Sequence, residues 1–148
     1  MIFERTLMAG WGDMDFNSHM RNTAFLDKSA DVRMMFFAEN GFGADEMHRL
    51  RVGPVIMKDD VEYFREVHLM DSVRVTLLRA GLAGDGSRFR VRNEFWRMDG
   101  TLAARVTSTG GWLDLNARKL VKPPEALRLA LLTLEQTPDL QSLPSSIK

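Results

Sequence analysis

With 148 residues, 45% of them hydrophobic and 27% charged, the sequence has the size and composition of one soluble globular domain. Its 20 basic residues balance its 20 acidic ones, which gives no support to general binding of nucleic acid or a membrane surface. Cysteine is absent, which excludes disulfides and zinc–thiolate sites. The three histidines lack metal-binding spacing, the N-terminus lacks a signal-like segment, and no apolar run reaches ~18 residues, so we expect a cytoplasmic protein with no metal, cofactor or membrane segment.

The first predicted elements are a strand and a long helix. A strand at residues 2–9 leads into a polar loop at 12–22. From 23 to 40, apolar residues at helical spacing cover most of the circumference, which predicts a helix that other elements enclose on several sides. Gly41 is the candidate C-terminal cap of this helix, and residues 43–50 are assigned to a loop.

Beyond residue 50 the apolar period changes to two, which is typical of strands. Strands separated by turn signals are predicted at 51–57, 60–67, 72–80, 88–97 and about 101–115. A last helix opens at Pro123-Pro124, the domain is expected to span 1–136, and 137–148 is expected to be a flexible tail. One buried helix among antiparallel strands predicts an α+β fold, and the open edge of such a sheet predicts a homo-oligomer.

The candidate chemistry lies in the polar loop, which reads Trp11-Gly12-Asp13-Met14-Asp15-Phe16-Asn17-Ser18-His19-Met20-Arg21-Asn22. Asp15, Asn17 and His19 stand at alternate positions and could converge on one reacting carbonyl. Asp15 would be base or nucleophile, Asn17 an orienter or oxyanion donor, and His19 a second proton-transfer group. Asn22 and Thr23 fit helix N-cap positions, which would direct free backbone N–H groups at the same place. The pattern predicts an acyl-transfer site at a loop-to-helix junction.

Structural interpretations of these side chains stay open. Asp13 could simply cap a turn, Asn17 could close a local side-chain turn, and Asn22 could serve only as a helix cap. His19 alone would be an ordinary structural histidine. The case for chemistry therefore depends on the whole loop rather than on any one residue.

The loop and the order of elements resemble the hotdog-fold acyl thioesterases, both the 4-hydroxybenzoyl-CoA thioesterase group and the acyl-ACP thioesterases. The acyl-ACP thioesterase loop reads roughly Trp-x-Asp-x-Asp-x-Asn-x-His-Val-Asn-Asn-x-x-Tyr, and it is matched by Trp11, Asp13, Asp15, Asn17, His19, Asn22 and Phe25. A second likeness, to Glu-Tyr-Arg-Arg-Glu-Cys, is found at Glu62-Tyr63-Phe64-Arg65-Glu66-Val67. Met20-Arg21 departs from the usual Val-Asn, and Val67 replaces a Cys sometimes given a catalytic part, so no thiol mechanism carries over.

The resemblance implies a hotdog domain over about 3–115 and hydrolysis, without a cofactor, of a thioester of CoA or acyl carrier protein. It implies as catalytic candidates Asp15, Asn17, His19 and Glu66. The substrate-binding candidates are Asn22, Thr23, Phe25, Phe64, Arg65, Arg88 and Arg90, of which the β-strand arginines could contact CoA phosphates or an acidic carrier, or form a solvated or subunit-interface face. A hotdog hydratase or dehydratase, or an acyl-thioester binder without turnover, remains the alternative because a fold does not fix an activity.

Overall fold

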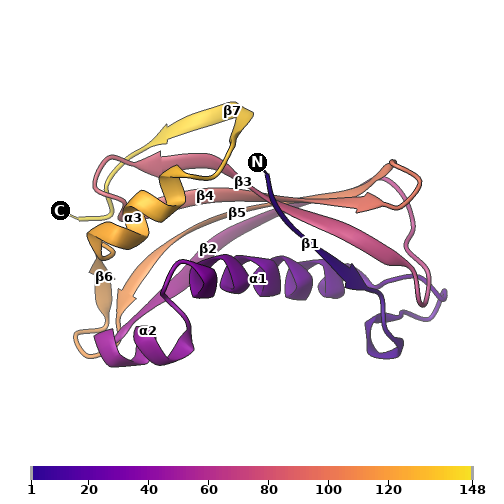
Figure 1. Ribbon diagram of the computed structural model, residues 1–148, viewed down its shortest axis with the longest axis horizontal. Helices are drawn as coiled ribbons and strands as arrows, with labels where there is room; N and C mark the ends of the chain where they lie inside the picture. The colour runs from indigo at the N-terminus through magenta and orange to yellow at the C-terminus, as the bar shows by residue number, and fades with distance from the viewer. Residues whose placement is uncertain (1, 148) are drawn as a thin grey trace.

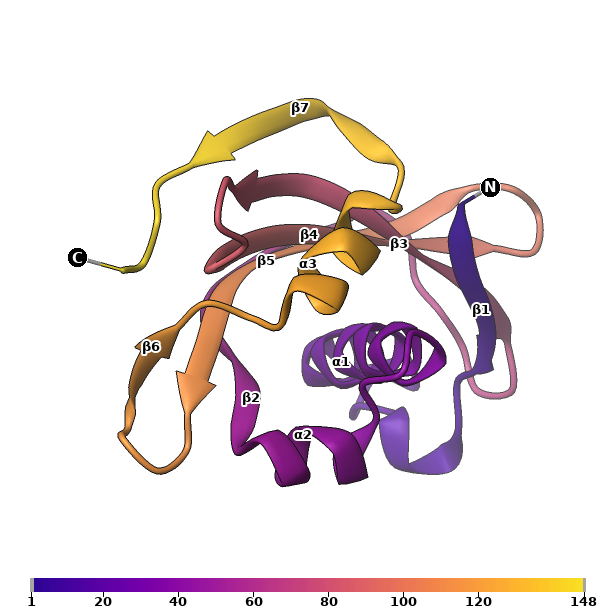
Figure 2. The same cartoon turned by 60° about the vertical axis from the view of Figure 1, so that its left-hand side comes forward.

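The computed structural model describes residues 2–147 and contains a curved sheet folded around one long helix, α1 (Asn22–Glu39) (Figure 1). The main path through the sheet runs in the order β1 (Phe3–Met8), β3 (Ser72–Ala83), β4 (Arg88–Arg97), β5 (Leu102–Asp114) and β2 (Val52–Tyr63), with every pair along it antiparallel. Seen along the axis of α1 in Figure 2, the sheet curves over the helix and α2 (Ala44–Leu50) lies below it. The predicted α+β fold is confirmed.

Helix α1 is buried on several sides, as its apolar pattern predicted. Its buried side chains are Ala24, Phe25, Ser29, Val32, Arg33, Phe36 and Phe37. Neighbours in sequence point about 100° apart on a helix, so the burial of both Phe36 and Phe37 requires protein on two sides. Gly41, at φ +88°, follows the helix in the left-handed region, and the Phe42 N–H donates to the Phe37 carbonyl at 2.8 Å. The predicted C-terminal cap is confirmed.

The largest fully buried side chain, Trp112 on β5, packs against the C-terminal half of α1. Its ring centroid lies 5.4 Å from that of Phe37 and 5.3 Å from that of Phe89. Its indole N–H donates to the Gly86 carbonyl at 3.1 Å, so burial leaves this donor satisfied. This aromatic cluster anchors the end of the helix that lies away from the polar loop.

The strand predictions are confirmed most closely for β4, which spans 88–97 as expected. The two predicted strands at 51–57 and 60–67 are instead one strand, β2, with an irregularity between Ile56 and Lys58 and an end at Tyr63. Pro54 does not break this strand because β2 lies at the edge of the sheet. On an edge strand, a proline can be accommodated without the loss of a hydrogen bond between strands.

Besides the 3₁₀ helix Trp11–Asp13 in the predicted polar loop, three short elements were not predicted. The predicted loop at 43–50 contains α2, whose single buried residue Met47 gives too little periodicity to recognise. β6 (Lys119–Val121) pairs with β5 before α3 (Glu125–Leu132), the confirmed last helix. β7 (Gln136–Leu143) lies parallel to β3, so the expectation of a tail without secondary structure is corrected for this segment.

Side chains from distant strands hold β7 in place. The guanidinium of Arg92 donates to both carboxylate oxygens of Asp139, at 2.9 and 2.7 Å. These bonds from Arg92 hold the pKa of Asp139 far below its usual range. Residues 1 and 148, the outermost positions of the predicted domain and tail, lie outside the described residues. Within residues 2–147, no helix is long and apolar enough to span a membrane.

Candidate active site

A pocket of about 360 Å³ opens where the polar loop meets the N-terminus of α1. Its lining residues are Asp15, His19, Met20, Asn22, Phe25, Tyr63, Phe64, Arg65, Glu66 and Val67. They come from two segments, 15–25 and 63–67, which are the two segments that carried the family resemblance. The pocket combines carboxylates and an imidazole with an aromatic wall.

Backbone pairing holds the two segments together. His19 and His68 form an isolated antiparallel bridge, and the Met20 N–H donates to the Val67 carbonyl at 2.7 Å. The side chains of Met20 and Val67 are buried beneath this pairing. This pairing brings the exposed side chains of the two segments together at the surface. Glu66 therefore contacts His19 of the same chain.

The Asp15 carboxylate organises the loop and lines the pocket. Its Oδ1 accepts hydrogen bonds from the backbone N–H groups of Asn17, at 2.8 Å, and His19, at 3.1 Å. Ser18 takes the left-handed conformation, φ +64°, that lets the chain turn around this carboxylate. Asp15 and His19 both line the pocket, whereas the exposed Asn17 side chain is not among the pocket-lining residues.

Asp13, the other loop carboxylate, has the structural role that was its simpler interpretation. Its Oδ2 accepts a hydrogen bond from the Gly10 N–H at 2.8 Å and lies 2.9 Å from the Lys28 ammonium. Partial burial raises the pKa of Asp13, but the bonds from Gly10 and Lys28 outweigh burial and leave that pKa below its ordinary value. Asp13 closes the short 3₁₀ helix Trp11–Asp13 and does not line the pocket.

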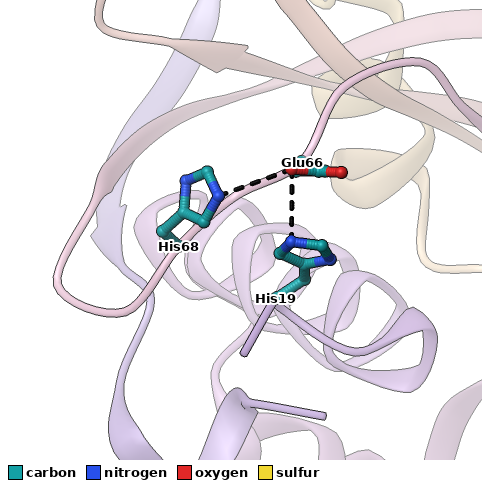
Figure 3. Close-up of side chains that lie close together, drawn as sticks. All are labelled: His19, Glu66 and His68. Carbon is teal, nitrogen blue, oxygen red and sulfur yellow. Dashed lines mark ion pairs between the residues drawn. The ribbon is translucent and has the colours of Figure 1, made fainter. Parts of the chain in front are cut away.

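Glu66 lies between two imidazoles (Figure 3). Its Oε2 is 3.2 Å from His19 Nε2 and 3.5 Å from His68 Nε2, and the two imidazole centroids are 5.3 Å apart. The sequence pointed to His19 and Glu66 but offered no partner for His68. Only the bridge between two remote segments brings His68 to this place.

The N-terminus of α1 begins one residue earlier than predicted. Arg21 occupies the N-cap position without a side-chain cap bond, so Asn22 and Thr23 lie within the first turn rather than capping it. The Asn22 Oδ1 accepts from the Thr23 N–H at 3.1 Å. As the first helical residue, Asn22 has a backbone N–H with no intrahelical acceptor, and it lines the pocket.

Tyr63, which was not singled out as a site residue, joins β2 to this helix end. Its hydroxyl donates to the Asn22 carbonyl at 3.3 Å. Burial raises the pKa of Tyr63, which keeps the phenol protonated and able to donate. Its ring also packs edge to face on Phe25, with centroids 5.4 Å apart. The sequence feature that could have identified Tyr63 as a site residue is its position in the second matched motif.

The remaining substrate-binding candidates divide by location. Phe25, Phe64 and Arg65 line the pocket, whereas Thr23 does not. Arg88 and Arg90 lie on β4, where Arg88 bonds to Ser146 and Arg90 to the Ala80 carbonyl, and the structure does not bring them to the pocket.

Comparison with known proteins agrees with this arrangement. The family model of the thioesterase-like superfamily matches residues 9–131. No curated protein has a sequence that matches the chain significantly. A hypothetical protein from Staphylococcus aureus, solved in complex with CoA, superposes with a TM-score of 0.83 at 21% identity, over 99% of this chain and 92% of that one.

Two further solved structures share the fold. A 1,4-dihydroxy-2-naphthoyl-CoA thioesterase from Synechocystis has a TM-score of 0.80 at 16% identity, covering 90% of this chain and 98% of its own. A probable thioesterase from Escherichia coli has a TM-score of 0.73 at 18% identity, covering 87% and 96%. At these identities the likeness concerns the fold, and it confirms the predicted hotdog architecture.

Proposed function

This chain belongs to the thioesterase-like superfamily, and we propose that it hydrolyses an acyl thioester to a free acid and a thiol. The observation that carries the proposal is the meeting, in one pocket, of the Asp15 carboxylate, the His19–Glu66 pair and the first turn of α1. The acyl group would lie against Phe25 and Phe64, with the thioester carbonyl at the helix N-terminus.

In this mechanism the Asp15 carboxylate starts the reaction in one of two ways. It removes a proton from a water that attacks the carbonyl carbon, or it attacks that carbon itself and forms a mixed anhydride that water then opens. In both routes a C–O bond forms and the C–S bond breaks. His19, 3.2 Å from Glu66, would give a proton to the departing thiolate, and Glu66 would orient the imidazole or the water.

The oxyanion would be stabilised by the start of α1. The Asn22 N–H points out of the helix without an intrahelical acceptor, and the positive end of the helix dipole lies at the same place. Tyr63, through its bond to the Asn22 carbonyl, fixes this turn against β2. In well-studied hydrolases the loss of one oxyanion donor costs about 10²–10³ in kcat.

For the thiol part of the substrate we propose CoA or an acyl carrier protein. Complex formation with CoA by the similar Staphylococcus aureus protein supports CoA as the first choice. Arg65 lines the pocket and is exposed, so its guanidinium is available to a phosphate or to an acidic carrier surface.

The test is thiol release from aromatic, short, medium and long acyl-CoA thioesters, followed by the same acyl groups on an acyl carrier protein. We expect hydrolysis of at least one class. Hydration of crotonyl-CoA without thiol release would identify a hydratase instead. Tight binding of acyl-CoA without turnover of any CoA or carrier substrate would contradict hydrolysis and support a binding protein.

We also propose that the single domain acts as a homodimer or a tetramer built from dimers. β2 lies at the edge of the sheet, paired with β5 on one side only, and presents exposed side chains of Ile56, Met57 and Tyr63. A second β2 would cover this edge. Light scattering after gel filtration should give two or four times the mass of one chain, and the mass of a single chain at high concentration would contradict the proposal.

A further inference from the structure

His19 and Glu66, which have proposed roles in hydrolysis, also form a cluster of three possible metal ligands with His68. We propose that His19, Glu66 and His68 together bind Zn²⁺ or a similar divalent transition metal. Each contributes one ligand atom, and the three atoms lie within 4.8 Å of one another. The sequence spacing of the histidines gave no hint of such a site, because His19 and His68 meet only through the bridge between remote segments.

The two distances from Glu66 are close to those of a tetrahedral zinc site. Zn–N and Zn–O bonds are about 2.0–2.2 Å, so two ligand atoms of a tetrahedral site are separated by roughly 3.3–3.6 Å. Glu66 Oε2 is 3.2 Å from His19 Nε2 and 3.5 Å from His68 Nε2. A metal ion could replace these two contacts, and the imidazole nitrogens of His19 and His68, which lie within 4.8 Å of each other, would close to the same separation around it.

The surroundings of His68 also suit a metal ligand. While its Nε2 faces Glu66, its Nδ1 lies 3.6 Å from Asp71 Oδ2, and that same carboxylate oxygen accepts from the His68 backbone N–H at 2.8 Å. A carboxylate behind the second ring nitrogen is the usual way in which a metal-ligating histidine is oriented. The side chain of Glu66 is 60% exposed, so an ion can reach the site from solvent.

The chemistry of the ligands selects the kind of metal. Two imidazoles and one carboxylate suit zinc and its transition-metal neighbours, whereas Mg²⁺ and Ca²⁺ prefer oxygen ligands alone. Three protein ligands leave a fourth position for water. We therefore expect Zn²⁺ and Co²⁺ to bind and Mg²⁺ not to compete.

Metal binding has a consequence for catalysis, which rests on the proposed function. A bound Zn²⁺ would occupy the Nε2 of His19 and the carboxylate of Glu66, both of which the proposed hydrolysis needs free. Occupancy of the site should then inhibit thioester hydrolysis. Removal of the metal with a chelator should restore it.

The experiment is calorimetric titration of the whole protein with Zn²⁺, without substrate, beside Co²⁺ absorption spectra that report nitrogen coordination. His68→Ala removes one ligand, and His48→Ala, in the exposed surface of α2, is the matched control. We expect one Zn²⁺ per chain in wild type and His48→Ala, and affinity in His68→Ala lowered by at least the 10–100-fold that loss of an outer-shell partner costs. No binding by wild type, or equal binding by His68→Ala, would overturn the proposal.

Activity assays keep the two proposals separate. Zn²⁺ should inhibit wild type and His48→Ala but not His68→Ala. Hydrolysis is followed as the initial loss of thioester absorbance, before enough thiol product accumulates to capture the metal. Zn²⁺ bound to wild type without inhibition would overturn the inhibitory role. A protein that binds Zn²⁺ but hydrolyses no thioester would refute the proposed function alone, and one that hydrolyses without binding Zn²⁺ would refute this inference alone.

Discussion

Replacement of Asp15 by Asn is expected to lower kcat for thioester hydrolysis by about 10²–10⁴-fold, the usual contribution of a positioned acid–base group. The amide keeps an oxygen that can accept from the N–H groups of Asn17 and His19, so the loop should retain its shape. What is lost is the negative charge that activates water or attacks the carbonyl. Steady-state kinetics on the best acyl-CoA substrate, with thermal unfolding as a check on the fold, measures the effect.

Asp13→Asn is the matched control, because it removes a carboxylate from the same loop and the same motif. Its contacts are with Gly10 and Lys28, and it does not line the pocket. We expect its kcat to remain within a few-fold of wild type. Full activity in Asp15→Asn would refute the assignment of Asp15, and an equal loss in both variants with unchanged stability would show that the charge of the loop, rather than Asp15, matters.

The Asp15 variant also separates an enzyme from a binding protein. If the chain only binds acyl thioesters, Asp15→Asn should leave both affinity and any measured turnover unchanged. If it is a hydrolase, the variant should still bind substrate while kcat falls, since the aromatic wall of Phe25 and Phe64 remains. Binding of a non-hydrolysable acyl-CoA analogue to the variant is expected in both cases, so the fall in kcat from wild type to the variant distinguishes them.

The parts of the site that the sequence predicted are those encoded within one segment. Asp15 and His19 are four residues apart, and the turn that joins them is closed by hydrogen bonds within that stretch. The length and enclosure of α1 followed from its own apolar pattern. Glu66 was predicted as a site residue only through the family resemblance, because nothing in its local sequence distinguishes it from an ordinary exposed glutamate.

The missed features depend on contacts between segments far apart in the chain. His68 gains its position from pairing with His19, and Tyr63 from its bond to the helix start. The sequence of β7 is polar and resembles that of a flexible tail. The strand is held by a contact that its own sequence does not reveal, the pairing of Asp139 with Arg92, 47 residues earlier. Such contacts leave no periodic signal in either partner, so propensity and pattern alone could not supply them.

Replacement of Trp112 by Ala is expected to lower the free energy of unfolding by about 3–5 kcal/mol, the range for deletion of a large aromatic side chain from a core. The indole is fully buried between Phe37 and Phe89, and its removal also leaves the Gly86 carbonyl without its donor. Urea unfolding followed by circular dichroism measures the change.

Trp11→Ala is the matched control, since this side chain is 83% exposed, and we expect a change within about 0.5 kcal/mol. Trp112 and the pocket lie at opposite ends of α1, so the folded fraction of Trp112→Ala should keep the KM of wild type while its stability falls. Equal destabilisation by the two variants would contradict the burial of Trp112 as the cause. A changed KM in fully folded Trp112→Ala would show instead that the aromatic cluster sets the position of the helix start, and hence of the Asn22 N–H.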